Sequence, residues 1–223
     1  MNILTNNAKT DKSVDYGYIT RGIHLAPANI SGYETCQWRS KGCTQACLNT
    51  AGRGAMNSVQ EARIKKTKFF YEDRNGFLDQ MDKEIVSADK SAKKKHMQLC
   101  IRPNLTSDVK WEDTGIMQLH HNIQFYDYTK SFQRMKAFLN GEMPFNYHLT
   151  FSRSEHNMQL CLLVLKLGGN VAAVFRDKLP DSYAGYPVIN GDEHDLRFKD
   201  RKRVWVGLTE KGLAKKDETG FVL

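Results

Sequence analysis

The regular alternation of strand-like and helix-like segments constrains the fold of this 223-residue chain more than any other feature. No hairpin turn signal separates the strand-like segments, and most of them are separated by a segment with apolar residues three or four positions apart. This order is typical of parallel strands joined by crossover helices. The predicted strands cover residues 16–25, 96–104, 122–130, 145–152, 170–175 and 203–208.

Four helices are predicted between these strands. Ser58 and Glu61 have the spacing of a capping box, which would open the first helix. Ser154 would cap the last helix, and the glycine pair Gly168 and Gly169 would end it. The four helices cover about residues 58–71, 77–95, 132–139 and 154–167.

Several predicted strands have one polar and one apolar face. In the second, Leu99 and Ile101 alternate with Cys100 and Arg102. The central strands of a flat doubly wound sheet are apolar on both faces, so a polar face indicates an enclosed or wet interior. We therefore predict an α/β fold, a partial (β/α) TIM-like barrel of about six parallel strands. Residues 1–14 would form a flexible N-terminal arm, and residues 15–223 a single domain.

The segment CQWRSKGCTQAC, from Cys36 to Cys47, follows the first strand directly and holds three of the five cysteines. Three thiolates on one short loop suit zinc or an iron–sulfur cluster. A disulfide would leave an odd cysteine, and nothing in the chain indicates an oxidising compartment. Six residues separate Cys36 from Cys43, more than the two to four usual between paired zinc ligands, which favours iron–sulfur over zinc.

The fourth ligand of such a site stays open. His24 ends the first strand on its polar face, and Cys100 shares the polar face of the second strand with Arg102. An open coordination position is the third alternative. Cys161 lies in an apolar helix, where a free cysteine is ordinarily a small hydrophobic residue.

Polar residues cluster after the predicted strands. Function in barrel folds collects at the carboxyl ends of the strands, so these residues predict a pocket for a small molecule or a nucleotide. None of them is identifiable as a nucleophile or general base, and whether the protein is an enzyme stays open. The candidate pocket residues are Arg102, Asn104, Ser107, Asp108, Asp127, Tyr128, Lys130, Ser152, Ser154, Glu155, Arg176 and Lys211.

The segment GDEHDLRF is acidic and contains Asp192, Glu193 and Asp195. Its carboxylates either bind a hard cation or form a turn whose acids pair with Arg197 or Arg176. The sequence pattern alone leaves both alternatives open.

The net charge of +8, from 33 Lys and Arg against 25 Asp and Glu, favours contact with nucleic acid. This supports an alternative function, a metal-stapled nucleic-acid-binding or host-interaction protein without catalysis. The positive charge is diffuse, however, and no basic strands with interleaved aromatics are present. The chain also has no apolar run of about 18 residues and no signal peptide, so we expect no membrane contact.

The chain resembles a family of tailed-bacteriophage proteins, the gene product eighty-eight family. The resemblance rests on segments that recur in one order: ACLNTAGRG, EARIKKTKFF, RPNLTSDVKWE, FYDYTK, NYHLTFSRSE, GGNVAAVF, PVINGDEHDLRF and VGLTEKG. It implies a phage protein in the cytoplasm of the infected bacterial host, with Cys36, Cys43 and Cys47 as its cysteine signature. Cys100 and Cys161 fall outside the signature positions.

The position of the cysteine loop also resembles that of radical S-adenosylmethionine enzymes. Those enzymes hold a [4Fe-4S] cluster by three cysteines after the first strand of a partial barrel, and they leave one iron open for the cofactor. Their cysteines are normally separated by three and then two residues, whereas six and three separate them here. No glycine-rich segment follows the second strand, so the resemblance implies a [4Fe-4S] cluster without a motif for S-adenosylmethionine.

Overall fold

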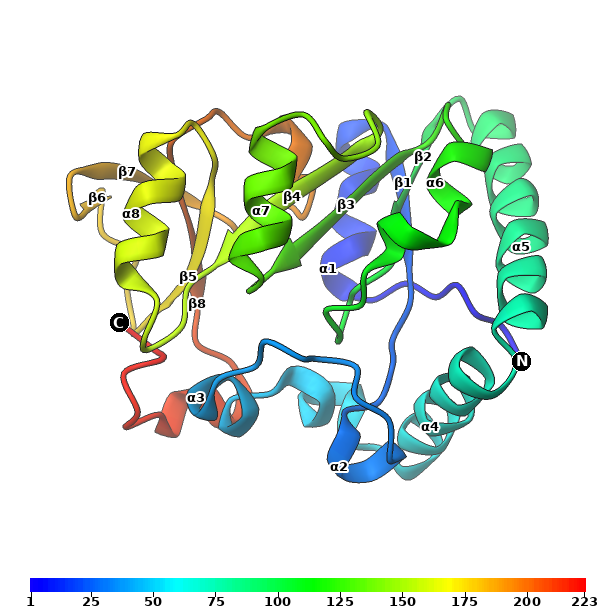
Figure 1. Ribbon diagram of the computed structural model, residues 1–223, viewed down its shortest axis with the longest axis horizontal. Coiled ribbons are helices and arrows are strands. Elements are labelled where there is room, and N and C mark those ends of the chain that lie inside the picture. The colour runs from blue at the N-terminus through cyan, green and yellow to red at the C-terminus, as the bar shows by residue number, and fades with distance from the viewer.

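The computed structural model describes residues 1–223 and contains one eight-stranded sheet with the order β1-β2-β3-β4-β5-β8-β7-β6 (Figure 1). Strands β1 to β5, β8 and β7 are parallel, and β6 pairs antiparallel with β7. The strands are β1 Tyr18–Gly22, β2 Gln98–Arg102, β3 Gln124–Thr129, β4 Tyr147–Ser152, β5 Val171–Phe175, β6 Ser182–Tyr183, β7 Tyr186–Asn190 and β8 Trp205–Thr209. The predicted mixed α/β fold with a mainly parallel sheet is confirmed.

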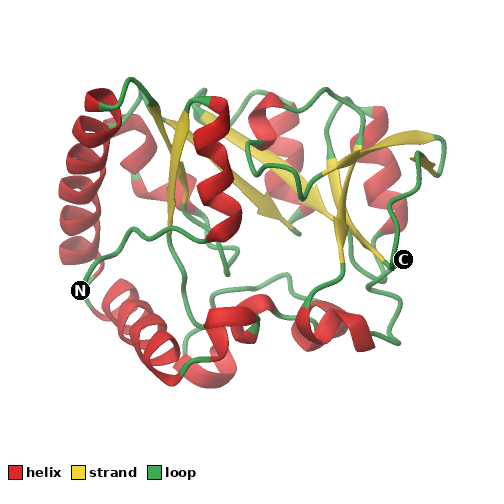
Figure 2. Ribbon diagram, turned by 180° about the vertical axis from the view of Figure 1, so that it is seen from behind, coloured by secondary structure: helices red, strands yellow, loops and turns green.

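Helices flank the sheet on two sides and at its lower end in the view of Figure 1. α7 and α8 lie in front of the sheet, and α1 lies behind it, as the reverse view in Figure 2 shows. The helices are α1 Ala8–Asp11, α2 Ala28–Ser31, α3 Lys41–Gln45, α4 Asn57–Glu72, α5 Arg74–Lys94, α6 Ile116–Leu119, α7 Phe132–Leu139 and α8 Met158–Lys166.

The main hydrophobic core lies between one face of the sheet and the long helices. Leu99 and Ile101 of β2 and Leu149 of β4 are buried there with Phe77 and Met81 of α5. These strand residues are every second residue of their strands, and side chains of a strand point alternately to its two faces. The predicted apolar strand face is therefore the face that the helices cover.

The sheet is open at both edges, so the predicted partial TIM-like barrel is not confirmed. β8, the sixth strand of the sequential parallel series, pairs with β7 and not with β1. β7 and β6 then form a hairpin at that edge, while at the other edge β1 is joined only by an isolated antiparallel bridge between Thr5 and Gly22.

Residues 1–14, expected as a flexible arm, pack against the body of the protein. Ile3 is fully buried, and its carbonyl accepts a hydrogen bond of 2.7 Å from Lys66 Nζ. The 3₁₀ helix η1, Lys12–Tyr16, follows α1 on the polar face of β1, where Thr20 Oγ1 donates to Ser13 Oγ at 2.9 Å. The N-terminal segment is therefore a layer of the fold.

A C-terminal segment covers the same polar face further along the sheet. Leu196 and Phe198 pack with Tyr126 and Cys100, which come from the polar sides of β3 and β2. The polar face that was expected to line a wet interior is thus covered by α1, η1 and residues 194–199.

Two helix starts differ from the predictions. α4 begins at Asn57 after an extended Met56 with no side-chain capping bond, so the predicted capping box of Ser58 is not formed. α8 begins at Met158, and the backbone N–H of Ser154 donates to Asn157 Oδ1 at 2.7 Å in the preceding turn. Ser154 therefore shapes the loop before the helix and does not cap it.

Candidate metal centre

The cysteine loop lies across the carboxyl ends of β2, β3 and β4, with α3 beside the C-terminal segment in Figure 1. Glu155, just after β4, holds α3 because its carboxylate accepts from Ser40 Oγ at 2.6 Å and from Gly42 N at 2.7 Å. At the other end of the loop, the N–H of Asp108 donates to the carbonyl of Thr35 at 2.8 Å. The loop is therefore fixed to the ends of two strands.

Cys36, Cys43 and Cys47 are partly buried free thiols. The pKa of Cys36 is raised to about 11, mainly by burial and in smaller part by the charges of Asp108, Cys43 and Cys47. Burial also raises the pKa of Cys47, with a contribution from the charge of Cys43.

The ligand geometry of a metal centre is not preformed around these sulfurs. No group of three or more histidine, cysteine, aspartate or glutamate side chains is arranged to hold a metal ion. Cys36 Sγ lies 3.8 Å from the carbonyl oxygen of Thr106, and Cys47 Sγ accepts from Asn49 N at 3.5 Å. The thiols therefore make separate weak contacts.

Lys130 brings a positive charge to the thiols. Burial lowers its pKa, but the charges of Cys43 and Asp108 outweigh burial and raise the pKa overall. Asp108 Oδ2 also accepts from the backbone N–H of Lys130 at 2.8 Å, and Lys130 Nζ lies 5.6 Å from the ring centre of Phe221. Of the predicted pocket residues, Asp108, Lys130 and Glu155 are the ones that the structure brings to the cysteine loop.

A hydrogen-bond network near the carboxyl ends of β2 and β3 joins Asn104, Ser107 and Asp127. Asp127 is fully buried and accepts from Asn104 N at 2.8 Å, from Asn104 Nδ2 at 3.0 Å and from the hydroxyl of Tyr147 at 2.9 Å. Ser107 Oγ donates to Asn104 Oδ1 at 2.7 Å. Burial raises the pKa of Asp127 to about 7. These residues stiffen the loop after β2.

Arg102 and Tyr128 lie on the covered polar face of the sheet, around the fully buried Asp195. The Asp195 carboxylate lies 2.7 Å from Arg102 Nη1 and 3.0 Å from Lys9 Nζ. The hydroxyls of Tyr126 and Tyr128 both donate to it at 3.3 Å. The sequence pattern does not predict this cluster, because it places Lys9 in a flexible arm and Asp195 in either a cation site or an acidic turn.

The acidic segment after β7 pairs with cations of the protein. Asp192 pairs with Lys211 and accepts from Thr209 N at 2.8 Å, while Asp195 pairs with Arg102 and Lys9. The cation partners differ from the predicted Arg197 and Arg176. The acids of this segment therefore form ion pairs in the structure, as the second of the two alternatives expects, although with other cations.

The four remaining predicted pocket residues make contacts that stabilise other parts of the chain. Ser152 contributes its carbonyl, which accepts from Asn157 Nδ2 at 3.0 Å. Arg176 donates to the carbonyls of Lys215 and Asp217 at 3.2 and 2.9 Å. Ser154 and Lys211 are occupied by the contacts described above.

The two candidate fourth ligands differ in their surroundings. Cys100 is fully buried, its Sγ lies 3.1 Å from Thr20 Oγ1, and the charge that raises its pKa, beyond burial, is that of Asp195. The ring of His24 lies among basic residues, and burial followed by the charge of Arg63 lowers its pKa to about 3. Its Nδ1 is buried without a hydrogen-bond partner.

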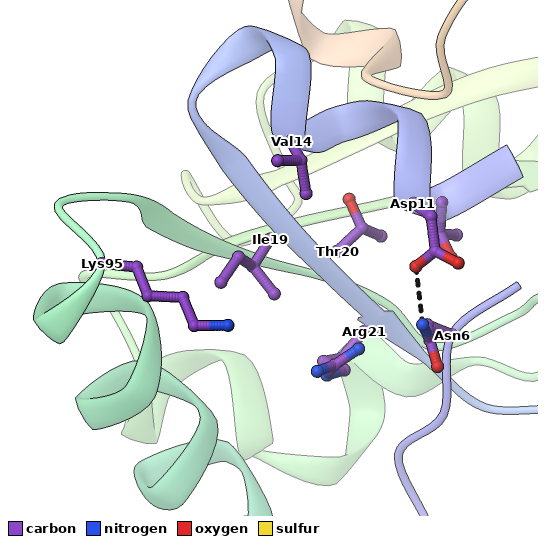
Figure 3. A pocket seen from close by; sticks show the side chains of 8 residues that line it. Asn6, Asp11, Val14, Ile19, Thr20, Arg21 and Lys95 are labelled. Atoms are coloured by element: carbon purple, nitrogen blue, oxygen red, sulfur yellow. Dashed lines mark hydrogen bonds between the residues drawn. The ribbon is translucent and has the colours of Figure 1, made fainter. Parts of the chain in front are cut away.

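Two cavities lie away from the cysteines. One of about 190 Å³ is bordered by η1, β1 and Lys95; in Figure 3 the side chains of Asn6 and Asp11 bond to each other at its edge. Another, of about 590 Å³ and open to solvent, is lined by Lys110, Glu112 and Gln133, among others. The predicted pocket for a small molecule does not coincide with either.

Comparison with known families bears on the whole chain, since residues 1–223 match the family described as Gene product 88. The chain belongs to the Gene product 88 family. This match confirms the resemblance to the phage gene-product family. No curated protein and no solved structure matches the chain. Within this Gene product 88 protein, no helix combines the length and the apolar character needed to cross a membrane.

Proposed function

We propose that this protein holds a [4Fe-4S] cluster on Cys36, Cys43 and Cys47. The observation that carries the proposal is that one loop with three unpaired thiols is anchored at the carboxyl ends of β2 and β4, through Asp108 and Glu155. Cysteine thiolates are the ligands of such clusters. The loop lies at the carboxyl ends of parallel strands, where α/β proteins usually bind their ligands.

The residues present fit this donor set chemically. Metal ligation requires thiolates, and coordination offsets the burial that keeps the thiol of Cys36 protonated in the free protein. The cationic Lys130, beside Cys43, balances negative charge from the thiolates. The three side chains must rotate to converge, since their sulfurs now contact separate neighbours such as Thr106.

The fourth coordination position falls to His24 or to an exogenous small molecule. His24 is a neutral imidazole with an unpartnered Nδ1, which is the form that ligates metals. Cys100 is disfavoured because its thiol faces Thr20 inside the covered sheet face.

When bound, the cluster would supply one-electron transfer. This chemistry would be redox or radical-type and would act on a small molecule or a nucleotide. Lys130 would orient an anionic group beside the cysteine loop. We place the protein in the cytoplasm of the infected host, where thiols stay reduced.

Anaerobic purification with iron, sulfide and zinc analysis tests the proposal. We expect iron and sulfide together with a broad absorption at about 400 nm. Cys36→Ser, Cys43→Ser and Cys47→Ser should each remove that absorption, while the matched Cys161→Ser should retain it. Zinc without sulfide would replace the cluster by a zinc site, and an unchanged spectrum in the three serine variants would refute the ligand assignment. A reduced cluster that S-adenosylmethionine leaves unperturbed would remove the radical version only.

A further inference from the structure

The amino ends of the parallel strands lie along the edge of the sheet that faces away from the cysteine loop. Helices α5, α7 and α8 end at this edge, because each returns the chain to the amino end of the next strand. It is the upper edge in Figure 1, whereas the cysteine loop lies at the lower end. We define the amino edge as the segments that lead into β2, β3, β4, β5 and β8, which are residues 89–97, 116–123, 136–146, 166–170 and 199–204.

Most of the net positive charge of the protein belongs to the amino edge. Its segments contain ten Lys and Arg residues against three Asp and Glu residues, a net charge of +7, whereas the whole chain has +8. Lys94 and Lys95 are exposed at the end of α5, and Arg201, Lys202 and Arg203 are exposed before β8. The charge that is diffuse along the sequence is therefore gathered at one end of the fold.

These basic side chains have few acidic partners. Lys93 pairs with Asp89 at 2.6 Å, and the side chain of Asp200 is 3% exposed and lies 3.3 Å from Arg197. Glu142 is the third acid of the amino edge, and it forms no ion pair. The other nine lysines and arginines of the edge form no ion pair either. This uncompensated charge favours a polyanion as the partner.

Buried asparagines hold neighbouring segments of the amino edge together. Asn146, before β4, donates from Nδ2 to three backbone carbonyls of the segment before β3, at 2.9 to 3.1 Å. Asn170, before β5, donates to the carbonyl of Arg201 at 2.9 Å and accepts from Val204 N at 3.2 Å. The amino edge therefore presents its side chains on a fixed backbone, which reduces the ordering cost of binding.

Phe145 adds an aromatic ring to the middle of this basic edge. It is 85% exposed, more than any other large apolar residue of the protein, and it directly precedes Asn146. β4, which it leads into, is the central strand of the row β2-β3-β4-β5-β8. Exposed Lys136 and Lys166 lie at the ends of α7 and α8, the helices before and after β4.

This combination matches the chemistry of a single nucleic-acid strand. β2 and β8 are four strand spacings apart, about 19 Å at roughly 4.8 Å each, so a strand of several nucleotides could run along the edge. Basic side chains contact its phosphates, and an exposed aromatic ring stacks on a base. A duplex keeps its bases stacked on one another, and it would leave Phe145 without a role.

We propose that the amino edge binds single-stranded nucleic acid. Lys94, Lys95, Arg201, Lys202 and Arg203 contact the phosphates, and Phe145 stacks on an unpaired base. The site lies at the opposite end of the sheet from the cysteine loop and requires no metal, so it goes beyond the cluster proposed above.

Fluorescence anisotropy of the full chain with labelled oligothymidylate of about 20 nucleotides tests the site. We expect binding that weakens steeply with salt. Arg201→Gln combined with Lys202→Gln should reduce the affinity about 10-fold at about 0.1 M salt and make the salt slope shallower by about 1.4, because each phosphate contact of a single strand contributes about 0.7. The matched control, Lys215→Gln with Lys216→Gln, removes the same charge from η6 (Gly212–Lys216) at the lower end of Figure 1 and should bind as the unmodified protein does.

Phe145→Ala distinguishes a single strand from a duplex. It should weaken binding of the single strand about 5-fold or more at every salt concentration and leave the salt slope unchanged, because it removes stacking and no charge. Binding of the duplex with oligoadenylate should be weaker and unaffected by this substitution. Leu213→Ala, which truncates another exposed apolar residue far from the amino edge, should change neither affinity.

Two results would overturn the site in protein whose thermal unfolding curve is unchanged: no binding of either oligonucleotide at about 20 mM salt, or an equal loss of affinity in the edge variant and its charge control. Equal affinity for single strand and duplex, together with no effect of Phe145→Ala, would overturn the assignment to a single strand. Cys36→Ser should bind as the unmodified protein does, so a failure of this site and a failure of the cluster are separate results.

Discussion

Replacing Asp195 by Asn tests what holds the covering layer on the polar face of the sheet. The substitution keeps the shape of the side chain and removes its charge. Asp195 is fully buried and forms ion pairs with Arg102 at 2.7 Å and with Lys9 at 3.0 Å. Its carboxylate also accepts hydrogen bonds from the hydroxyls of Tyr126 and Tyr128 at 3.3 Å. It links residues of the N-terminal segment, β2 and β3 to one carboxylate.

The expected loss is about 3 kcal/mol of unfolding free energy. Breaking a buried ion pair costs about 3–5 kcal/mol, because the partner charge stays buried and unpaired. The lower value applies here since the side chains of Lys9 and Arg102 keep 25% and 14% of their exposure, so that water screens them in part. With a urea slope of about 2–3 kcal/mol/M, the unfolding midpoint should fall by about 1–1.5 M.

Urea unfolding followed by circular dichroism measures this loss. Asp15→Asn, which removes an exposed carboxylate of the same N-terminal segment, serves as the matched control and should change stability little. If Asp195→Asn shifts the midpoint no further than Asp15→Asn does, the carboxylate does not hold the layer, and the reasoning fails.

The pH dependence of the same residue has a defined sign. Burial acts to raise the pKa of Asp195, but the charges of Arg102 and Lys9 outweigh it and hold the pKa well below its usual value. The contribution of Asp195 to the free energy of unfolding is therefore present above the unfolded pKa of about 3.9, and it is lost as the pH falls below that value. Asp195→Asn should remove this part of the acid sensitivity.

Three further substitutions test the surroundings of the cysteine loop. Gly42→Ala should destabilise the protein by about 1–3 kcal/mol in urea unfolding, because its Cβ would collide with Thr219 Oγ1 and lie 2.5 Å from Phe221 Cβ; an unchanged midpoint would contradict this packing. Glu155→Gln should speed the reaction of the loop thiols with a disulfide reagent, since it weakens the anchors of α3; an unchanged rate would argue against the anchor. Burial raises the pKa of Asp127 to about 7, so its contribution to stability should be full below about pH 4 and decline toward neutral pH. Asp127→Asn should flatten stability between those limits, and an unchanged slope would be inconsistent with a raised pKa.

The sheet could be predicted from sequence because its signals are local. Each predicted strand overlaps an observed one. In β2, Leu99 and Ile101 point to the hydrophobic core, whereas Cys100 and Arg102 point to the opposite face, which the N-terminal segment and residues 194–199 cover. The missing hairpin turn signals among the first five strands agree with their parallel pairing.

The hairpin of β6 and β7 escaped prediction for a local reason. Its turn residues Ala184 and Gly185 both have positive φ, 47° and 82°, as a type I′ turn requires. Asn or Asp normally occupies the first of these positions and signals such a turn, whereas alanine does not. The open edge of the sheet follows from this missed hairpin, because β7 occupies the side of β8 that barrel closure would need.

Of the candidate site, only the cysteines and the residues that contact their loop could be predicted. Lys130 and Glu155 follow their strands at the expected edge and reach the loop. The pairing of Lys9 with Asp195 joins opposite ends of the chain, and no periodic pattern encodes such a contact.

The Mössbauer spectrum of the anaerobically purified full chain tests the central claim most directly. Three cysteine ligands and one different ligand predict a [4Fe-4S] cluster in which one iron site differs from the other three. The Cys43→Ser variant should lose this signal, while Cys100→Ser should keep it. A protein without iron, or one whose cluster signal depends on Cys100 and has four equivalent iron sites, would contradict a cluster held by Cys36, Cys43 and Cys47.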